Sequence, residues 1–180
     1  MTTQEIIARL KEGNARFINA VKNDGDISKA VRIDTAEHGQ HPYAVVISCA
    51  DSRVVPEDIF MAGIGEIFDI RVAGNVIAES QMGSIEYAVG HLGCRLILVL
   101  GHTNCGAVGA AIEGGTSSYV KTITDRIKSA VGSETDSARA ARLNVMKSVK
   151  DIKEKLTVKK DDFAICGAIY DIREGRVDWL

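Results

Sequence analysis

The sequence lacks an excess of charge of either sign and lacks any long apolar run. Its 180 residues carry 22 Lys and Arg against 24 Asp and Glu, a formal charge of -2, so no strong field attracts nucleic acid or anionic lipid. No apolar run approaches the roughly 20 residues that span a bilayer, and the polar start of the chain lacks the apolar stretch of a secretory signal peptide. We therefore expect a cytoplasmic protein with neither nucleic acid nor membrane as a partner.

Internal repeats and low-complexity segments are also absent, and cysteine is scarce. Hydrophobic residues make up 46% of the chain, enough to bury the core of one domain, so we expect a single domain over residues 1–180. Cysteines in a chain without an export signal are more often thiols or metal ligands than disulfides. Their positions therefore matter more than their number: Cys49, Cys94, Cys105 and Cys166.

The central part of the chain predicts strands that alternate with helices. Three apolar runs indicate buried strands, at residues 43–47, 67–72 and 96–100. Between the last two, apolar side chains recur at steps of three to four residues over residues 82–92, the pattern of a helix that crosses back over the sheet to join parallel strands. The predicted fold class is therefore α/β.

The start of the chain predicts one or two amphipathic helices. Thr2 and Glu5 have the spacing of a capping box, and a polar stretch over residues 23–40 follows the helical pattern. The apolar stripe of this segment comprises Ile6, Ile7, Leu10, Phe17, Ile18 and Val21.

The C-terminal half predicts three more helices and a final strand. A short helix of small residues over 107–112 should stop at Gly114, because glycine tolerates left-handed geometry. Periodicity predicts two longer helices over residues 120–131 and 138–156. Residues 163–172 predict a strand, followed by a turn and a short extension. The pattern does not give the orientation of this strand in the sheet.

Three residues are candidate metal ligands. Cys49 and His102 each follow a predicted parallel strand, and the carboxyl ends of such strands are where α/β sheets build sites. Cys105 stands at a predicted helix start, where the helix dipole favours a thiolate. Two thiolates and an imidazole suit zinc and leave a fourth position for water, the arrangement of catalytic zinc. The alternative is that both cysteines are small buried hydrophobes and the histidine is an ordinary core residue.

The loop after Cys49 adds a charged pair, Asp51 and Arg53. Two thiolates neutralise the charge of the zinc ion, so water bound there is acidified less than at a site of three histidines, where its pKa is about 7. Asp51 could accept the hydrogen of bound hydroxide while Arg53 holds the carboxylate. In a second, closed state Asp51 would itself be the fourth zinc ligand. The alternative without a function is a salt bridge that closes the loop.

Both segments together resemble the β-carbonic anhydrases. The family signature Cys-x-Asp-Ser-Arg is matched by residues 49–53, and its later Gly-His-x-x-Cys-Gly is matched by residues 101–106. Nearly the whole chain shares the resemblance. Further matching segments are residues 12–17, 40–42, 65–68, 71–75, 85–89 and 167–171.

The resemblance implies a fold and an assembly. It implies a central, mostly parallel sheet of four strands with an added antiparallel edge strand, flanked by helices. It also implies a homodimer in which an amino-terminal helical arm, residues 1–22, embraces the partner subunit. A dimer of dimers, a homotetramer, is common in the family.

The resemblance also implies roles for individual residues. One zinc ion per subunit would be held by Cys49, His102 and Cys105, and the catalytic pair would be Asp51 and Arg53. Cys94 and Cys166 match no ligand position and are expected to be buried thiols. Implied substrate-binding residues are Gln40, Phe68, Ala73, Tyr87 and Gly106.

The function implied is that of a carbonic anhydrase, a lyase that reversibly hydrates carbon dioxide to bicarbonate and a proton by means of zinc-bound hydroxide. One alternative is a hydrolase of carbon disulfide or carbonyl sulfide on the same scaffold. Another is a non-catalytic, zinc-binding oligomeric protein in which Asp51 stays on the metal. The chain departs from the family pattern at Val72 and at Asp69, where many members have asparagine and an apolar residue. A carboxylate in that strand must be paired, exposed at an edge or uncharged.

Overall fold

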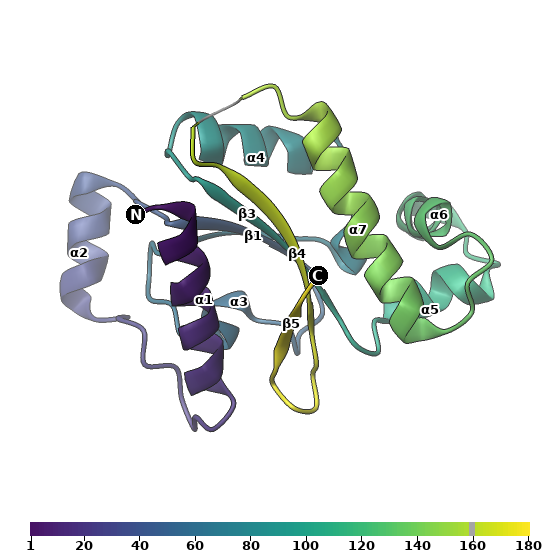
Figure 1. Ribbon diagram of the computed structural model, residues 1–180, viewed down its shortest axis with the longest axis horizontal. Coiled ribbons are helices and arrows are strands. Elements are labelled where there is room, and N and C mark those ends of the chain that lie inside the picture. The colour runs from purple at the N-terminus through teal and green to yellow at the C-terminus, as the bar shows by residue number, and fades with distance from the viewer. Residues whose placement is uncertain (159–160) are drawn as a thin grey trace.

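Five strands form one sheet in the computed structural model, which describes residues 1–158 and 161–180 (Figure 1). The strand order is β2 (Ile67–Arg71), β1 (Ala44–Ser48), β3 (Leu96–His102), β4 (Ala164–Tyr170) and β5 (Val177–Trp179). The first four are mutually parallel, and β5 pairs antiparallel with β4 at the edge. The predicted α/β fold is thereby confirmed. The orientation that the sequence pattern left open is parallel for β4 and antiparallel for β5.

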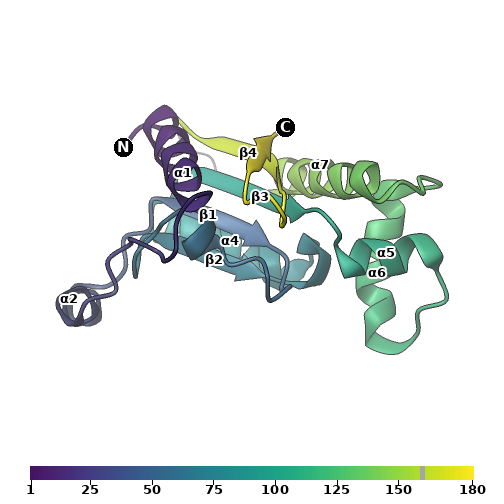
Figure 2. The same ribbon diagram turned by 90° about the horizontal axis from the view of Figure 1, so that it is seen from below.

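Helices connect these strands and cover both faces of the sheet (Figures 1 and 2). They are α1 (Thr3–Phe17), α2 (Lys29–His38), α3 (Pro56–Ile59), the 3-10 helix η1 (Ala73–Asn75), α4 (Glu79–Gly90), α5 (Gly106–Glu113), α6 (Ser118–Val131) and α7 (Ser137–Lys155). In the described part of the chain, no helix combines the length and apolar character needed to cross a bilayer.

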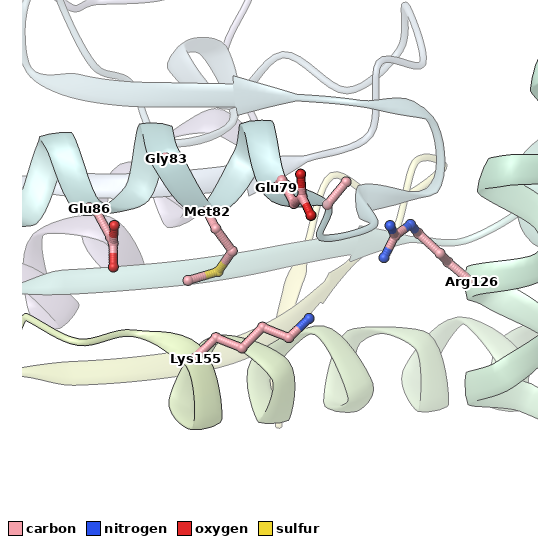
Figure 3. A pocket seen from close by; sticks show the side chains of 7 residues that line it. Glu79, Met82, Gly83, Glu86, Arg126 and Lys155 are labelled. Atoms are coloured by element: carbon pink, nitrogen blue, oxygen red, sulfur yellow. The ribbon is translucent and has the colours of Figure 1, made fainter.

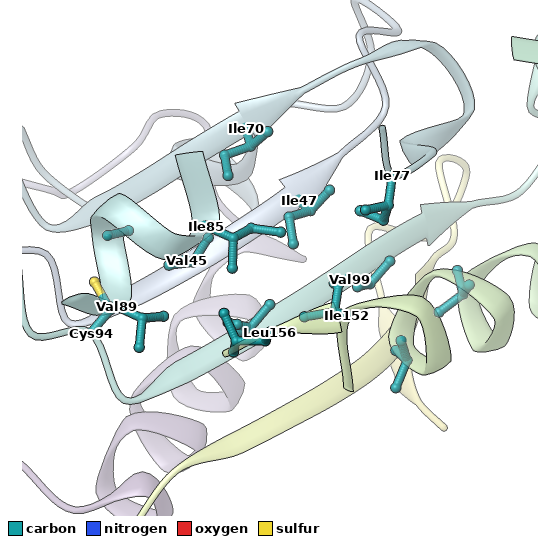
Figure 4. Close-up of a cluster of buried hydrophobic side chains, with 14 of the residues drawn as sticks. Val45, Ile47, Ile70, Ile77, Ile85, Val89, Cys94, Val99, Ile152 and Leu156 are labelled. Atoms are coloured by element: carbon teal, nitrogen blue, oxygen red, sulfur yellow. The ribbon is translucent and has the colours of Figure 1, made fainter. Parts of the chain in front are cut away.

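Side chains of the central strands alternate between two apolar layers. In β1, Val45 and Ile47 point to the layer that contains α4 and α7 (Figure 4). Ala44 and Val46 point to the opposite layer, with α1 and α3. Because strands buried on both faces need apolar residues at every position, β1 and β3 read as continuous apolar runs.

A third apolar cluster supports the carboxyl end of the sheet. It joins Val108 of α5, Ile127 of α6 and Ala140 of α7 to two cysteines, Cys49 and Cys105. In Figure 2, α5 and α6 lie beyond the ends of β1 and β3. This cluster therefore packs against the segments that follow those two strands.

The first helix is shorter than its apolar pattern predicts. The capping box is present, since the Thr2 hydroxyl accepts from the Glu5 amide and the Glu5 carboxylate accepts from the Thr2 amide. The helix ends at Phe17, however, and Ile18 and Val21 are 45% and 100% exposed. Their assignment to the apolar stripe of a helix was wrong, because the chain turns after Phe17.

Helix α2 was not predicted from the polar stretch that contains it. Ser28 caps its start by accepting from the Val31 amide, and Gly39 ends it at a φ of 84°. None of its residues is buried, and Figures 1 and 2 show it standing apart from the sheet. The residues at its two ends therefore determine where this helix begins and ends, and it packs no apolar face on its own domain.

Smaller corrections concern the ends of elements and one thiol. Strand β3 continues to His102, so this histidine ends the strand and does not follow it. Helix α4 ends at Gly90, which leaves Leu92 beyond it. Cys94 is buried as expected, whereas Cys166 is only half-buried, because the short edge strand β5 pairs only with residues 168–170 of β4 and does not reach it.

Candidate metal centre

Three ligands come together where two neighbouring strands end. Cys49 follows β1, His102 ends β3, and Cys105 caps the start of α5. Because β1 and β3 are adjacent and parallel, their carboxyl ends meet at one edge of the sheet. The ligand atoms of the three residues lie within 4.8 Å of one another, and all three side chains are buried. Among the residues that the structure describes, this is the one group of metal-ligand type that converges in this way.

The His102 ring is oriented with one nitrogen free for a metal. Its Nδ1 lies 2.9 Å from the Thr103 carbonyl oxygen, which can only accept, so Nδ1 carries the hydrogen. Nε2 is then a lone-pair acceptor, and it has no hydrogen-bond partner among the described residues although the side chain is 0% exposed. A buried acceptor without a donor is costly, and a metal ion satisfies it.

The two thiols also favour a cation between them. The pKa of Cys49 is lowered to about 4, mainly because the Cys105 thiol donates to its sulfur; burial opposes this shift, and the Gly74 amide at 3.3 Å adds to it. The pKa of Cys105 is raised far above its usual value, first by its bond to Cys49 and then by burial. The helix start alone therefore does not make Cys105 a thiolate. A second negative charge beside the first needs a divalent cation, so the set of two sulfurs and one nitrogen fits zinc.

Asp51 and Arg53 form a two-pronged ion pair beside these ligands. Arg53 Nε donates to Asp51 Oδ1 at 2.9 Å, and Arg53 Nη2 donates to Oδ2 at 2.7 Å. The guanidinium holds the pKa of the Asp51 carboxyl well below its usual range. Asp51 Oδ2 lies 4.0 Å from His102 Nε2. The carboxylate thus borders the candidate site while Arg53 holds it, as in the state in which it is not a zinc ligand.

A second arginine supports the same loop, and sequence reasoning gave it no role. Arg71 ends β2 opposite Ser48 in the β1 register. Its Nη2 donates to the Asp51 carbonyl oxygen at 2.7 Å, and its Nε donates to the Cys49 carbonyl oxygen at 3.3 Å. Because register cannot be read from one strand alone, the position of Arg71 beside the ligand loop became visible only in the assembled sheet.

Two of the predicted substrate-binding residues border the ligands. Ala73 precedes Gly74, whose amide donates to Cys49 Sγ. Gly106 follows Cys105 as the first residue of α5, and the space around its Cα is open. Both are therefore chain neighbours of residues that form or contact the ligand set, and their part in binding substrate stays a prediction.

The other three lie away from the ligands of the same chain. Phe68 pairs with Val45, four residues before Cys49, which is roughly 13 Å along a strand. Gln40 precedes β1 and is exposed. Tyr87 is on α4, 47% exposed, with its ring 6.2 Å from that of Phe68. Phe68 is half-buried against the apolar layer that contains α4, whereas Gln40 and Tyr87 are exposed.

A hollow of about 460 Å³ lies elsewhere, between α4, the middle of α6 and the end of α7 (Figure 3). Glu79 and Glu86 line one wall, and Arg126 and Lys155 line the other. Arg126 donates to the Ile77 carbonyl oxygen at 3.0 Å. The described residues that line this hollow include neither cysteine nor histidine, so it is separate from the metal centre.

Known proteins resemble the chain over most of its length. The family model described as carbonic anhydrase matches residues 44–177. Carbonic anhydrase 2 of Mycobacterium tuberculosis is 46% identical over 127 residues, which cover 68% of this chain and 61% of that protein. The chain thus spans less than two thirds of that relative's length. A carbonic anhydrase of Mycolicibacterium smegmatis is 36% identical over 188 residues, covering 94% of this chain and 89% of that protein.

The fold is also found among solved structures. One of two tetrameric β-carbonic anhydrases from the filamentous ascomycete Sordaria macrospora superposes with a TM-score of 0.74 at 23% identity, over 84% of this chain and 87% of that one. The predicted resemblance is confirmed. Since the family model spans most of the chain and the M. smegmatis relative aligns with nearly all of it, the chain belongs to the β-carbonic anhydrase family.

Proposed function

We propose that this protein interconverts carbon dioxide and bicarbonate with a zinc ion held by Cys49, His102 and Cys105. The observation that carries the proposal is the convergence of these three ligand atoms within 4.8 Å beside the Asp51–Arg53 pair. Bound there, zinc supplies a Lewis acid that makes a water molecule acidic enough to react near neutral pH. Relatives named as carbonic anhydrases support the same reaction.

Asp51 has the role of orienting the reacting water. Arg53 keeps its carboxylate ionised, so both oxygens can only accept hydrogen bonds. Oδ2, on the side of His102, can accept the O–H of that water and direct an oxygen lone pair toward the carbon of the substrate. Arg71 fixes the backbone that carries the carboxylate, so the orientation is set before substrate arrives.

Two other functions are less well supported. Hydrolysis of carbon disulfide or carbonyl sulfide would use the same attack on a linear molecule, but the curated relatives carry the name carbonic anhydrase. A non-catalytic zinc protein would keep Asp51 on the metal, and here Arg53 binds both carboxylate oxygens. Both alternatives predict that zinc-loaded protein hydrates carbon dioxide slowly or not at all.

We also propose that the protein is a homo-oligomer, at least a dimer, of single-domain subunits that span residues 1–180. A ten-residue helix such as α2 is marginal without packing, yet it buries no side chain on its own domain. Phe68 and Tyr87 lie at the β2 edge, away from their own ligands, where a partner's centre could use them. The Sordaria macrospora relative is described as tetrameric.

We propose that the part of the arm that reaches the partner subunit is the C-terminal end of residues 1–22 together with α2. Ile6 and Leu10 of α1 are buried in the protein's own core, whereas Ile18 and Val21 are exposed. A cytoplasmic location belongs to the same proposal, since a reducing compartment keeps ligand cysteines as thiols. Substrates are then small, carbon dioxide and bicarbonate, with no nucleic-acid or membrane partner.

Stopped-flow hydration of carbon dioxide on protein assayed for zinc in the same sample tests the function. We expect zinc-dependent turnover that rises with pH. Asp51→Ala should keep its zinc and lose about 100-fold or more in kcat, because a misplaced reacting group costs about that much. Cys105→Ala should lose both zinc and turnover. Zinc-loaded wild-type protein without turnover at any pH would overturn the proposal, and carbon disulfide would be tried next.

A further inference from the structure

Thr103 is hydrogen-bonded to its neighbour His102, to the last residue of β4 and to the connection that follows β4. It lies between His102 and Cys105, and its carbonyl oxygen accepts from His102 Nδ1 at 2.9 Å. Its amide donates to the Tyr170 carbonyl oxygen at 2.9 Å, which extends the pairing of β3 with β4. Its hydroxyl accepts from the Ile172 amide at 3.2 Å, in the connection from β4 to β5. The carbonyl group that orients the histidine is thus fixed by bonds on either side of it.

The next residue extends this support to the other half of the site. Asn104 has a φ of 54°, in the left-handed region, and its carbonyl oxygen accepts from Arg53 Nη2 at 3.3 Å. The carbonyl groups of Thr103 and Asn104 are consecutive on the backbone. A shift of this dipeptide would therefore displace the acceptor of His102 and the acceptor of Arg53 together.

Packing alone does not fix the dipeptide. Its outer side lines a hollow of about 400 Å³, together with Asp136, Asp171 and Arg173. Thr103 is half-buried and Asn104 is exposed. Because side chains do not fill this side, the hydrogen bonds of Thr103 have to hold the segment in place.

The anchor that the hydroxyl contacts is itself firmly held. The turn between β4 and β5 is bound by Asn14, 6% exposed, whose Nδ2 donates to the Gly175 carbonyl oxygen at 2.8 Å and whose Oδ1 accepts from the Val177 amide at 2.9 Å. The Asp171 carboxylate accepts from the amides of Arg173 and Glu174 within the turn. The Ile172 amide is therefore a rigid donor.

We propose that the Thr103 hydroxyl is a positioning group for the metal centre, which ties the β4–β5 turn to the dipeptide that orients His102 and Arg53. The proposal rests on the proposed function, because it assigns the hydroxyl a part in that same site. Thr103 touches neither substrate nor metal in this role. It acts through the Thr103 and Asn104 carbonyl groups.

The test compares zinc-loaded Thr103→Val, which keeps the branched shape and removes the acceptor, with Thr103→Ser, which keeps the hydroxyl. The first readout is the rate at which a chromogenic chelator withdraws zinc, and the second is kcat and KM for carbon dioxide hydration. Changes in groups that support metal ligands cost about 10- to 100-fold in affinity or activity. We expect Thr103→Val to release zinc about tenfold faster and to lose kcat with little change in KM, and Thr103→Ser to restore both.

Thr116→Val is the matched control, since it removes a hydroxyl of another half-buried threonine that bonds Thr124 and not the site. It should release zinc at the wild-type rate. Wild-type zinc release and kcat in Thr103→Val would overturn the proposal, as would a Thr103→Ser variant no better than Thr103→Val. If Thr103→Val does not fold, Thr103→Ala removes the same hydroxyl without added bulk and decides in its place. The chelator rates decide the inference even if carbon dioxide is not the substrate.

Discussion

The metal centre is built from residues that are incomplete without a cation. His102 has one ring nitrogen satisfied by Thr103 and the other left without a partner among the described residues. Cys49 and Cys105 share a proton that is hard to remove, first because of the hydrogen bond between them and then because of burial and the charge of Cys49. Each residue alone could be an ordinary core side chain. Because the three converge, one metal ion can satisfy the histidine nitrogen and both sulfurs at once.

Asp69 is a second residue with a buried polar atom that lacks a hydrogen-bond partner. Its titration makes the free energy of unfolding depend on pH. Its Oδ1 is buried and has no partner among the described residues. Burial first, and then the Glu57 carboxylate, raise its pKa to about 7, against a smaller lowering by Arg71 and the Ile70 amide. Between pH 4 and 7 the folded protein therefore holds a proton that the unfolded chain releases. The free energy of unfolding should fall as pH rises through this range and stay low above it.

Asp69→Asn should remove that fall. The difference in free energy of unfolding between this variant and wild type should be about 1–2 kcal/mol more favourable to the variant at pH 8 than at pH 4. This is less than the full pKa shift implies, because water screens a partly exposed group. Urea denaturation at both pH values measures it. Asp161→Asn, which removes an exposed carboxylate, is the control and should keep the wild-type pH dependence. An Asp69→Asn variant with that same dependence would show that Asp69 is ionised in the folded protein.

At the scale of elements, the glycine of η1 is required by both backbone and packing. Gly74 has a φ of 67°, and a Cβ there would lie 2.6 Å from Ile127 Cδ1 and 3.2 Å from the Ala107 Cβ. Gly74→Ala should cost about 1–3 kcal/mol of stability and loosen the amide that donates to Cys49 Sγ. Thermal unfolding and zinc content check both effects.

Gly109→Ala is the control, because a Cβ at this position of α5 meets nothing within 4 Å. It should be neutral or slightly stabilising. Equal melting temperatures for the two variants would contradict the argument that Gly74 is required.

The same scale shows which elements the sequence could predict. Strands β1 and β3 follow from continuous apolar runs and helices α6 and α7 from apolar periodicity, because their buried faces belong to this chain. Helix α2 has no buried face, so periodicity could not reveal it. The ligands and the Asp51–Arg53 pair follow from spacing, since they sit on short local segments. Arg71 and the bonds of Thr103 do not, because they depend on strand register and on segments far apart in the chain.

At the scale of the whole molecule, the exposed apolar residues should mark the contact between subunits. Ile33 of α2 is 47% exposed on a helix that stands apart from the sheet, and a lone helix of this length needs a partner surface. Ile33→Lys should therefore shift the assembly toward monomer, because it buries an unpaired charge at the contact. Light scattering after size exclusion measures the mass across a dilution series.

Turnover should fall in parallel with the loss of subunit contact, since Gln40, Phe68 and Tyr87 lie away from the ligands of their own chain and would act on a partner's centre. Tyr119→Lys is the matched control, for Tyr119 is 88% exposed at the start of α6, far along the chain from α2. It should leave both mass and turnover unchanged. A wild-type protein that is monomeric and fully active at all concentrations would show that one copy completes the site, and Gln40, Phe68 and Tyr87 would then need no partner subunit.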